Sequence, residues 1–428
     1  MIGLRSIRNV RTDSVAKQYE RWAYPKPVTD LAAEDQTGIR DAGDPSLMHY
    51  AYWPTREYWE GMDILVAGCG TNEAARYAYH NPTARVVGID VSASSLRHEE
   101  FLKERYGLAN LSLYHIAIEE VSELKLNFDL VAANGVIHHL ADPAAGLTAL
   151  KQVLRLEGVL QSMLYGTYKR VGVYMLQKLF RLMGLEQTQE DLMIVKATLK
   201  ELSQHHSANT YLRSAPDLDC DSGLVDTFLH KRDRSFTVMD CFNLLGECGL
   251  KFQGWIENGF YYPELQVSLD SPLFTKIDEM SEPEIWCAME LFCGDISKHL
   301  FFACREDRPK TSYSINFNSN DFLKFIPAKR VTNVTPSNAL LGRPLTIQRD
   351  PMPPVALDNI QAAFFENVNG ENTVKECIDE LGLKKKPVEM ENYARNLVRS
   401  LWRAGYLFIK LPETTESQVR LSSGSMRS

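Results

Sequence analysis

The sequence predicts an α/β protein built around a doubly wound, mostly parallel β-sheet. Two observations indicate this class. Short apolar runs of the length of buried strands occur at 62–67, 85–90, 111–116, 128–133 and 158–165. Segments with helical periodicity lie between several of them, near 72–80, 93–106 and 143–155. Repeated alternation of strand and crossover helix is typical of a parallel sheet with helices on both faces.

The rest of the chain predicts additional parts around this sheet. Its 428 residues exceed one typical domain, so two or three are expected. Two runs, Leu250–Trp255 and His299–Arg305, predict a strand pair that closes the sheet. Residues 351–411 read as helix, helix, helix, strand, which suggests a small winged-helix-like α+β module. We therefore expect an N-terminal cap segment at 1–60, an α/β domain at 61–305 with helical insertions at about 166–225 and 258–297, a linker at 306–350, the module at 351–411 and a disordered tail at 412–428.

Composition excludes several classes of protein. The net charge of −8, from 47 basic and 55 acidic residues, argues against a general nucleic-acid binder. No run of about eighteen apolar residues occurs, and the N-terminus lacks the apolar core of a secretory signal. The cysteines form no CxxC pair and match no zinc module. We expect a cytoplasmic protein with free thiols, no metal and no membrane segment.

A glycine turn follows the first predicted strand, in the sequence Asp63-Ile-Leu-Val-Ala-Gly-Cys-Gly70. Gly68 and Gly70 allow a sharp bend and a close approach of a ligand to the backbone. Asp90 ends the second predicted strand, where a carboxylate can accept hydrogen bonds from ribose hydroxyls. The pattern predicts a nucleotide site at the carboxyl edge of a Rossmann-like sheet.

A second motif, Asn134-Gly-Val-Ile-His-His-Leu-Ala-Asp-Pro143, follows the fourth predicted strand. With both motifs in order, the chain resembles the class I S-adenosylmethionine-dependent methyltransferases of the type 11/12 domain, over about residues 60–165 and more loosely over 230–305. A nicotinamide dinucleotide site would instead have glycine or alanine where Glu73 stands. The C-terminal module is similar to bacterial protein methyltransferases with a regulatory domain.

The resemblance implies S-adenosylmethionine as cofactor and assigns roles to individual residues. Asp90 would hold the ribose hydroxyls, and Asn134 would offer its carbonyl to the cofactor's ammonium group. Ala117 stands where the family often has an adenine-binding acid, which leaves Ile118 and Glu119 for adenine. The full set of implied cofactor-binding residues is Gly68, Cys69, Gly70, Asp90, Val91, Ile118, Glu119 and Asn134.

Methyl transfer mainly requires alignment of a nucleophile and exclusion of water, and a base only if the nucleophile arrives protonated. His138 and Tyr165 are the candidate catalytic residues, with packing and a rim position as their alternatives. His139 is a weaker candidate, and because the two histidines are adjacent we expect no metal pair there.

Three further sets of residues have two interpretations each. Tyr19 and Tyr24 would either cap the cofactor or simply pack. His230 and Asp233 would either face the acceptor or lie in a solvated turn. Asp90 itself would, in the alternative, cap the helix that follows it.

The methyl acceptor stays open between three hypotheses. The first is a small-molecule metabolite, and the second is a protein that docks on the C-terminal module. The third is a non-catalytic, cofactor-binding regulator whose winged-helix-like module contacts a partner or nucleic acid, which would need a basic recognition helix. Lys384–Lys386, Arg395, Arg399 and Arg403 supply positive charge, although a solvated helix face explains them equally well. A homodimer is also possible, and a nucleic-acid partner is not expected.

Overall fold

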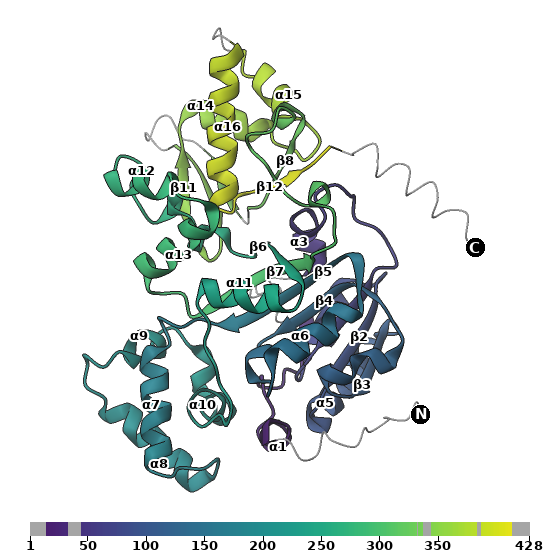
Figure 1. The fold of residues 1–428 in the computed structure, drawn as a ribbon, viewed down its shortest axis with the longest axis vertical. Helices are drawn as coiled ribbons and strands as arrows, with labels where there is room; N and C mark the ends of the chain where they lie inside the picture. Colours follow the sequence, from purple (N-terminus) through teal and green to yellow (C-terminus); the bar gives the residue numbers. More distant parts are fainter. Residues whose placement is uncertain (1–13, 33–43, 332, 337–343, 383–386, 413–428) are drawn as a thin grey trace. The chain divides into compact units, whose positions relative to one another are not determined.

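The computed structural model describes residues 14–32, 44–331, 333–336, 344–382 and 387–412. The chain divides into two compact units (Figure 1). The first, here the sheet unit, comprises Met1–Leu47, Trp59–Ile256 and Glu290–Arg308; the second unit comprises Met48–Tyr58, Glu257–Met289 and Pro309–Ser428. The predicted disordered tail, except for its first residue, and Lys384–Lys386 lie outside the described residues.

A seven-stranded sheet with the order β3-β2-β1-β4-β5-β7-β6 forms the centre of the sheet unit. Its strands are β1 (Asp63–Ala67), β2 (Arg85–Asp90), β3 (Leu111–His115), β4 (Phe128–Asn134), β5 (Leu154–Tyr165), β6 (Leu250–Trp255) and β7 (Lys298–Arg305). The pairs among β1 to β5 are parallel, and β7 runs antiparallel to β5 and β6. The predicted mostly parallel, doubly wound sheet and its closing strand pair are confirmed.

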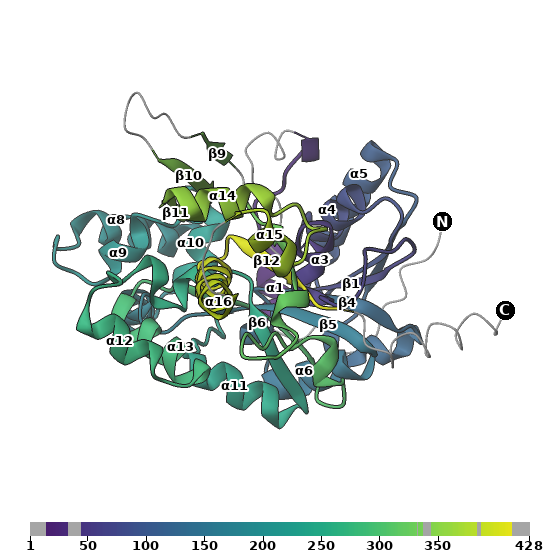
Figure 2. The ribbon, with the colours of Figure 1, turned by 90° about the horizontal axis from the view of Figure 1, so that it is seen from above.

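Helices cover both faces of this sheet. They are α4 (Glu73–His80), α5 (Ala93–Tyr106), α6 (Pro143–Gln152) and α11 (Val238–Glu247), with the 3₁₀ turns η2 (Ile118–Leu124) and η3 (Ile137–His139). Figure 2 shows α4 and α5 on one side of the strands and α6 and α11 on the other. Local sequence signals set the helix ends: the Ser92 side chain accepts a hydrogen bond from the Ser95 N–H at the start of α5, and Gly107, at φ 62°, ends it.

A group of helices follows β5, over the stretch where a helical insertion at 166–225 is expected and a few residues beyond it. These helices are α7 (Val171–Leu182), α8 (Gln189–Glu201), α9 (Ala208–Leu212), η4 (Pro216–Asp219) and α10 (Asp221–Phe228). They share a core of buried residues that includes Leu176, Phe180 and Phe228, together with Trp22 next to α1 (Ser14–Arg21). The insertion therefore has a core of its own, to which the N-terminal segment contributes.

The second unit comprises three separate stretches of the chain, and its core is formed mainly by the last of them. Its helices are α12 (Pro272–Asp278), α14 (Asn359–Asn367), α15 (Val374–Asp379) and α16 (Pro387–Arg403), with the 3₁₀ turns η5 (Asn258–Phe260), η6 (Pro263–Leu265), η7 (Lys310–Ser312) and η8 (Phe322–Lys324). The helices α3 (Pro45–Tyr52) and α13 (Glu282–Cys293) each have residues in both units. Buried members of the core include Phe322, Ile347, Phe364, Val374 and Tyr406.

The strands of the second unit lie partly where a linker is expected. They are β8 (Ile326–Lys329), β9 (Asn333–Thr335), β10 (Leu345–Arg349), β11 (Met352–Leu357) and β12 (Leu407–Lys410). β8 pairs with β12, and β9, β10 and β11 form an antiparallel sheet. The stretch 306–350 therefore contains paired strands, because Leu345 and Ile347 alternate into the core. Most of the expected insertion at 258–297 likewise belongs to the second unit, not to the sheet unit.

The basic residues of α16 are paired within the second unit. Arg395 pairs with Glu391 at 2.6 Å, and both Arg399 and Arg403 pair with Asp278. These arginines therefore do not form the unpaired basic face that a nucleic-acid recognition helix would present. Among the described residues, no helix has the length and apolar content needed to cross a bilayer.

Candidate active site

The turn between β1 and α4 needs glycine at two positions. Gly68 and Gly70 have φ values of 72° and 57°, a conformation that residues with a Cβ rarely adopt. A Cβ on Gly68 would lie 2.6 Å from Cγ2 of Val136, and one on Gly70 would lie 2.9 Å from Cδ of Pro25. The turn is therefore held between the tip of β4 and the N-terminal segment.

Asp90 links the tips of β1 and β2. Its Oδ2 accepts a hydrogen bond from the Gly70 N–H at 2.9 Å, and its Oδ1 accepts one from the Ser92 N–H at 2.7 Å. Burial raises the pKa of the Asp90 carboxyl, although the Ser92 and Gly70 N–H groups act in the opposite direction. The helix-cap interpretation of Asp90 is wrong, because Ser92 occupies the N-cap of α5.

A cavity of about 630 Å³ opens at this edge of the sheet. All the residues assigned to the cofactor by resemblance line it: Gly68, Cys69, Gly70, Asp90, Val91, Ile118, Glu119 and Asn134. Tyr165 lines it as well, as do Tyr19 and Tyr24 of the N-terminal segment, and so does His139. His138 does not, and lies fully buried against the Tyr165 ring with centroids 4.0 Å apart.

Asn134 belongs to a polar network that sequence reasoning missed. Its Nδ2 donates to Oε1 of Glu73 at 2.6 Å, and its Oδ1 accepts from Nε2 of Gln161 at 2.6 Å. Gln161 is completely buried in β5. An amide in the largely apolar run Val159-Leu-Gln-Ser-Met-Leu164 is the signal that could have found it, since a buried polar group needs partners.

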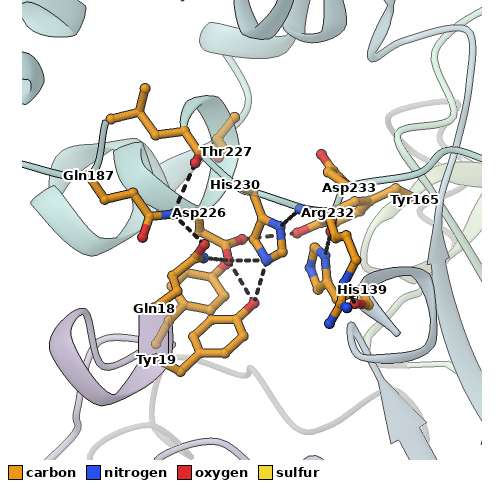
Figure 3. Close-up of polar contacts among 12 residues, drawn as sticks. Gln18, Tyr19, His139, Tyr165, Gln187, Asp226, Thr227, His230, Arg232 and Asp233 are labelled. Carbon is orange, nitrogen blue, oxygen red and sulfur yellow. Dashed lines mark hydrogen bonds and ion pairs between the residues drawn. The ribbon is translucent and has the colours of Figure 1, made fainter. Parts of the chain in front are cut away.

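A second polar cluster lies at the end of β5, around the buried carboxylate of Asp226 in α10 (Figure 3). Tyr19 donates to its Oδ1 at 2.8 Å, and Tyr165 donates to its Oδ2 at 3.3 Å. Gln18 Nε2 also donates to Oδ1, at 3.4 Å. Burial raises the pKa of the Asp226 carboxyl, while His139 and the Tyr19 hydroxyl lower it. Sequence reasoning missed Asp226, although a single acid within Leu224-Val-Asp-Thr-Phe228 is a detectable signal.

Two histidines from distant elements stack beside this carboxylate. The rings of His139 and His230 have centroids 3.9 Å apart and an interplanar angle of 20°. Nδ1 of His139 contacts the Arg232 carbonyl oxygen at 2.8 Å, and Nδ1 of His230 accepts from the Arg232 N–H at 2.9 Å. Burial lowers the pKa of both His138 and His230 well below the usual value, so these two rings are neutral.

The solvated-turn interpretation of His230 and Asp233 is wrong. His230 is 2% exposed, and the Asp233 side chain forms a buried ion pair with Arg170 at 3.0 Å. The Arg170 guanidinium also lies 3.7 Å above the centre of the Tyr165 ring. Arg170 therefore supports one wall of the cavity from behind.

Comparisons with known proteins agree with this architecture. Residues 65–160 match the family model of the methyltransferase domain. An uncharacterized protein of Synechococcus sp. is 28% identical over 71% of this chain and 72% of its own length. A malonyl-[acyl-carrier protein] O-methyltransferase of Acetivibrio thermocellus is 30% identical over 24% of this chain and only 36% of its own length.

Among solved structures, PKMT2 from Rickettsia typhi covers 87% of this chain and 76% of its own chain with a TM-score of 0.60. At 14% identity, this likeness shows a shared fold. In its sequence motifs, in the domain at 65–160 and in its fold, the chain resembles the class I S-adenosylmethionine-dependent methyltransferases.

Proposed function

We propose that the protein is an S-adenosylmethionine-dependent methyltransferase that acts on a small-molecule metabolite. One observation carries the proposal: the glycine turn, Asp90, Asn134 and a cluster of aromatic and titratable side chains line a single cavity. Val136 and Pro25 already occupy the positions that a Cβ on Gly68 and on Gly70 would take, so the turn that lines the cavity requires glycine at both places. The polar groups that line the cavity, and its size, fit a nucleoside-containing cofactor.

The cofactor supplies a methyl group already made electrophilic by its sulfonium. What remains for the protein is to bind both partners, to orient the nucleophile and to exclude water. Asp90 would accept the ribose hydroxyls, while the polar network of Asn134, Glu73 and Gln161 would meet the ammonium group. Tyr19 and Tyr24 line the same cavity, so the N-terminal segment would cover the bound cofactor.

A small acceptor is favoured because the N-terminal segment contributes Tyr19 and Tyr24 to the lining of the cavity, and Arg232, which follows helix α10, lines it as well. A protein acceptor that docks on the second unit remains the alternative, and a non-catalytic regulator is the third hypothesis. Incubation of the protein with methyl-labelled S-adenosylmethionine and a cell extract separates them. Label in small molecules supports the proposal, label in protein supports the alternative, and label in neither supports the regulator.

Cofactor binding itself is tested by calorimetry with S-adenosylhomocysteine. Asp90→Ala should weaken binding by about tenfold or more, because two charge-assisted hydrogen bonds to the ribose would be lost. Asp129→Ala is a matched control, since this strand aspartate lies outside the cavity and pairs with Arg155. Equal affinity of the Asp90→Ala variant and the wild type would remove Asp90 from the cofactor site.

A further inference from the structure

The ring of His139 is fixed in one tautomer by the backbone. Its Nδ1 lies 2.8 Å from the Arg232 carbonyl oxygen, which can only accept a hydrogen bond. Nδ1 therefore carries the hydrogen, and the neutral ring has its lone pair on Nε2. Within the described part of the chain this Nε2 has no hydrogen-bond partner, and His139 lines the cavity. The free lone pair is available to a ligand in the cavity.

His230 is fixed in the opposite tautomer by the same residue. Its Nδ1 accepts a hydrogen bond from the Arg232 N–H, so this nitrogen carries no hydrogen and Nε2 does. Nε2 lies 3.4 Å from the Tyr19 hydroxyl oxygen, which in turn donates to Asp226. His230 and Tyr19 thus form a chain of donors that ends on the Asp226 carboxylate.

Asp226 is placed to stabilise a positive charge on His139. Its two oxygens accept hydrogen bonds from Tyr19, Tyr165 and Gln18, as expected of an ionised carboxylate. A ring nitrogen of His139 lies within 4.8 Å of one of these oxygens. In a buried site a pair of opposite charges at this separation attracts more strongly than it would in water. The cluster therefore places a carboxylate beside the ring that would receive the proton.

We propose that His139 is the general base of the reaction, and that the acceptor is a hydroxyl or an ammonium whose attacking atom arrives protonated. This inference rests on the proposed methyltransferase function. The proton of the attacking atom moves to Nε2 of His139, and the electron pair it leaves forms the bond to the methyl carbon. The carbon–sulfur bond breaks, its electron pair goes to sulfur, and the ring later releases the proton to water. A carboxylate acceptor needs no base, and Asp226 would repel it.

The same group of side chains has the composition of a metal site, but its hydrogen bonds disfavour metal binding. His139, Asp226 and His230 lie close enough to hold one ion. Yet the hydrogen on Nε2 of His230 occupies the position that a metal would need, and Nδ1 is already an acceptor for the Arg232 N–H. Neutral imidazole binds a metal only through an unprotonated nitrogen. Elemental analysis of the purified chain should therefore find far less than one zinc per chain, and one zinc per chain would overturn the proposal.

The tautomers can be measured without any acceptor. Nitrogen-15 labelling of histidine and long-range proton–nitrogen correlation spectra distinguish Nδ1–H from Nε2–H rings. His139→Gln and His230→Gln assign the two signals. We expect Nδ1–H for His139 and Nε2–H for His230 at pH 7.5. An Nε2–H signal for His139 would overturn the proposal, because that ring could not take a proton from the cavity.

The catalytic role is tested by the rate of label transfer into extract from methyl-labelled S-adenosylmethionine. His139→Gln should lower the rate by about 100-fold or more, the usual effect of losing a general base. The residual rate should rise about tenfold per pH unit, because only an acceptor that is already deprotonated would react. His230→Gln keeps an N–H donor toward Tyr19 and should lose less than about tenfold. His205 is an exposed histidine of the insertion, and His205→Gln is the control for loss of an imidazole.

Calorimetry separates this proposal from the proposed function. If the wild type and His139→Gln bind S-adenosylhomocysteine equally well and transfer label equally fast, the general base is overturned and the methyltransferase stands. If the wild type binds the cofactor but labels nothing, the general base is also overturned. If the wild type does not bind S-adenosylhomocysteine, the proposed function itself fails. If His139→Gln binds S-adenosylhomocysteine as the wild type does but transfers label slowly and at a rate that rises with pH, both the general base and the methyltransferase function are supported.

Discussion

Two adjacent histidines of this protein occupy different environments. His138 and His139 belong to the single 3₁₀ turn η3, in which successive side chains point in different directions. His138 packs fully buried against Tyr165, whereas His139 lines the cavity. The sequence identified the pair as candidates but favoured His138. The motif around these histidines does not determine at which residue the turn η3 begins. The sequence alone therefore could not show which of the two rings faces the ligand.

The burial of His138 predicts a dependence of stability on pH. Burial lowers the pKa of His138 in the folded state. The contribution of the neutral ring to the free energy of unfolding is therefore complete above the unfolded pKa of about 6.5 and is lost as the pH falls below it. The free energy of unfolding then decreases by up to about 1.4 kcal/mol per pH unit for one proton. Hydrogen exchange of the β5 amides between pH 7 and pH 5.5 should show this loss, and His138→Phe should reduce it. The slope should be unchanged in His205→Phe, and an unchanged slope in His138→Phe would contradict the prediction.

At the scale of elements, the turn after β1 allows a test of steric fit against backbone strain. Gly61 and Gly68 both have positive φ, but only a Cβ at Gly68 would clash, because nothing lies within 4 Å of the position at Gly61. Gly61→Ala should cost about 1–2 kcal/mol of stability and leave S-adenosylhomocysteine affinity unchanged. Gly68→Ala should cost more and weaken binding by about tenfold or more. Calorimetry and thermal unfolding measure both effects, and equal behaviour of the two variants would contradict the steric argument.

The attachment of α1 to α10 gives a second prediction for an element. Gln18 and Tyr19 of α1 both donate to Asp226. Asp226→Asn replaces one accepting oxygen by a donor and should weaken this attachment by about 1–2 kcal/mol. Hydrogen exchange in the peptide Ser14–Arg21 should accelerate by about tenfold or more. Asp221→Asn, which breaks only a surface ion pair of the same helix with Lys196, should change it little, and equal acceleration in both variants would count against the role of Asp226.

Elements with strong local signals were predictable, and those without were not. Strand β2 and helix α5 match the predicted 85–90 and 93–106, because a buried apolar run and well-defined caps specify them. Strand β9 has only exposed residues, and β11 contains two prolines in Met-Pro-Pro-Val-Ala-Leu. Neither has the alternating pattern of a half-buried strand, so pairing with β10 alone defines them.

At the scale of the whole molecule, the second unit depends on contacts between distant stretches of the chain. The Leu411 N–H donates to the Pro54 carbonyl oxygen at 2.7 Å, and Arg403 pairs with Glu264 at 3.3 Å. Sequence patterns report neighbours along the chain, so they could suggest a C-terminal module but not its partners at 48–58 and 257–289. The predicted linker therefore begins at 306 and the predicted module at 351, whereas the second unit also includes the two earlier stretches of the chain.

This arrangement predicts how the chain responds to truncation. Ending the chain at residue 335 would remove β12, the partner of β8, and much of the core around Phe322. We expect the shortened protein to expose apolar surface and to aggregate, as light scattering would show. Truncation after Pro412, which keeps β12, should leave the protein monodisperse. A well-behaved, cofactor-binding fragment ending at 335 would show that the removed second-unit residues are not needed for solubility.

The backbone of residue 232 has a consequence for the comparison of related sequences. Its N–H and its carbonyl oxygen orient the two stacked imidazoles, and both are main-chain atoms. Every amino acid except proline supplies the same pair. For these two hydrogen bonds alone, any residue except proline would serve at that position. The Arg232 side chain adds a separate contact, from Nε to the His139 carbonyl oxygen at 3.0 Å. In related sequences, the spacing between position 232 and the second imidazole is therefore the sign of this proton arrangement.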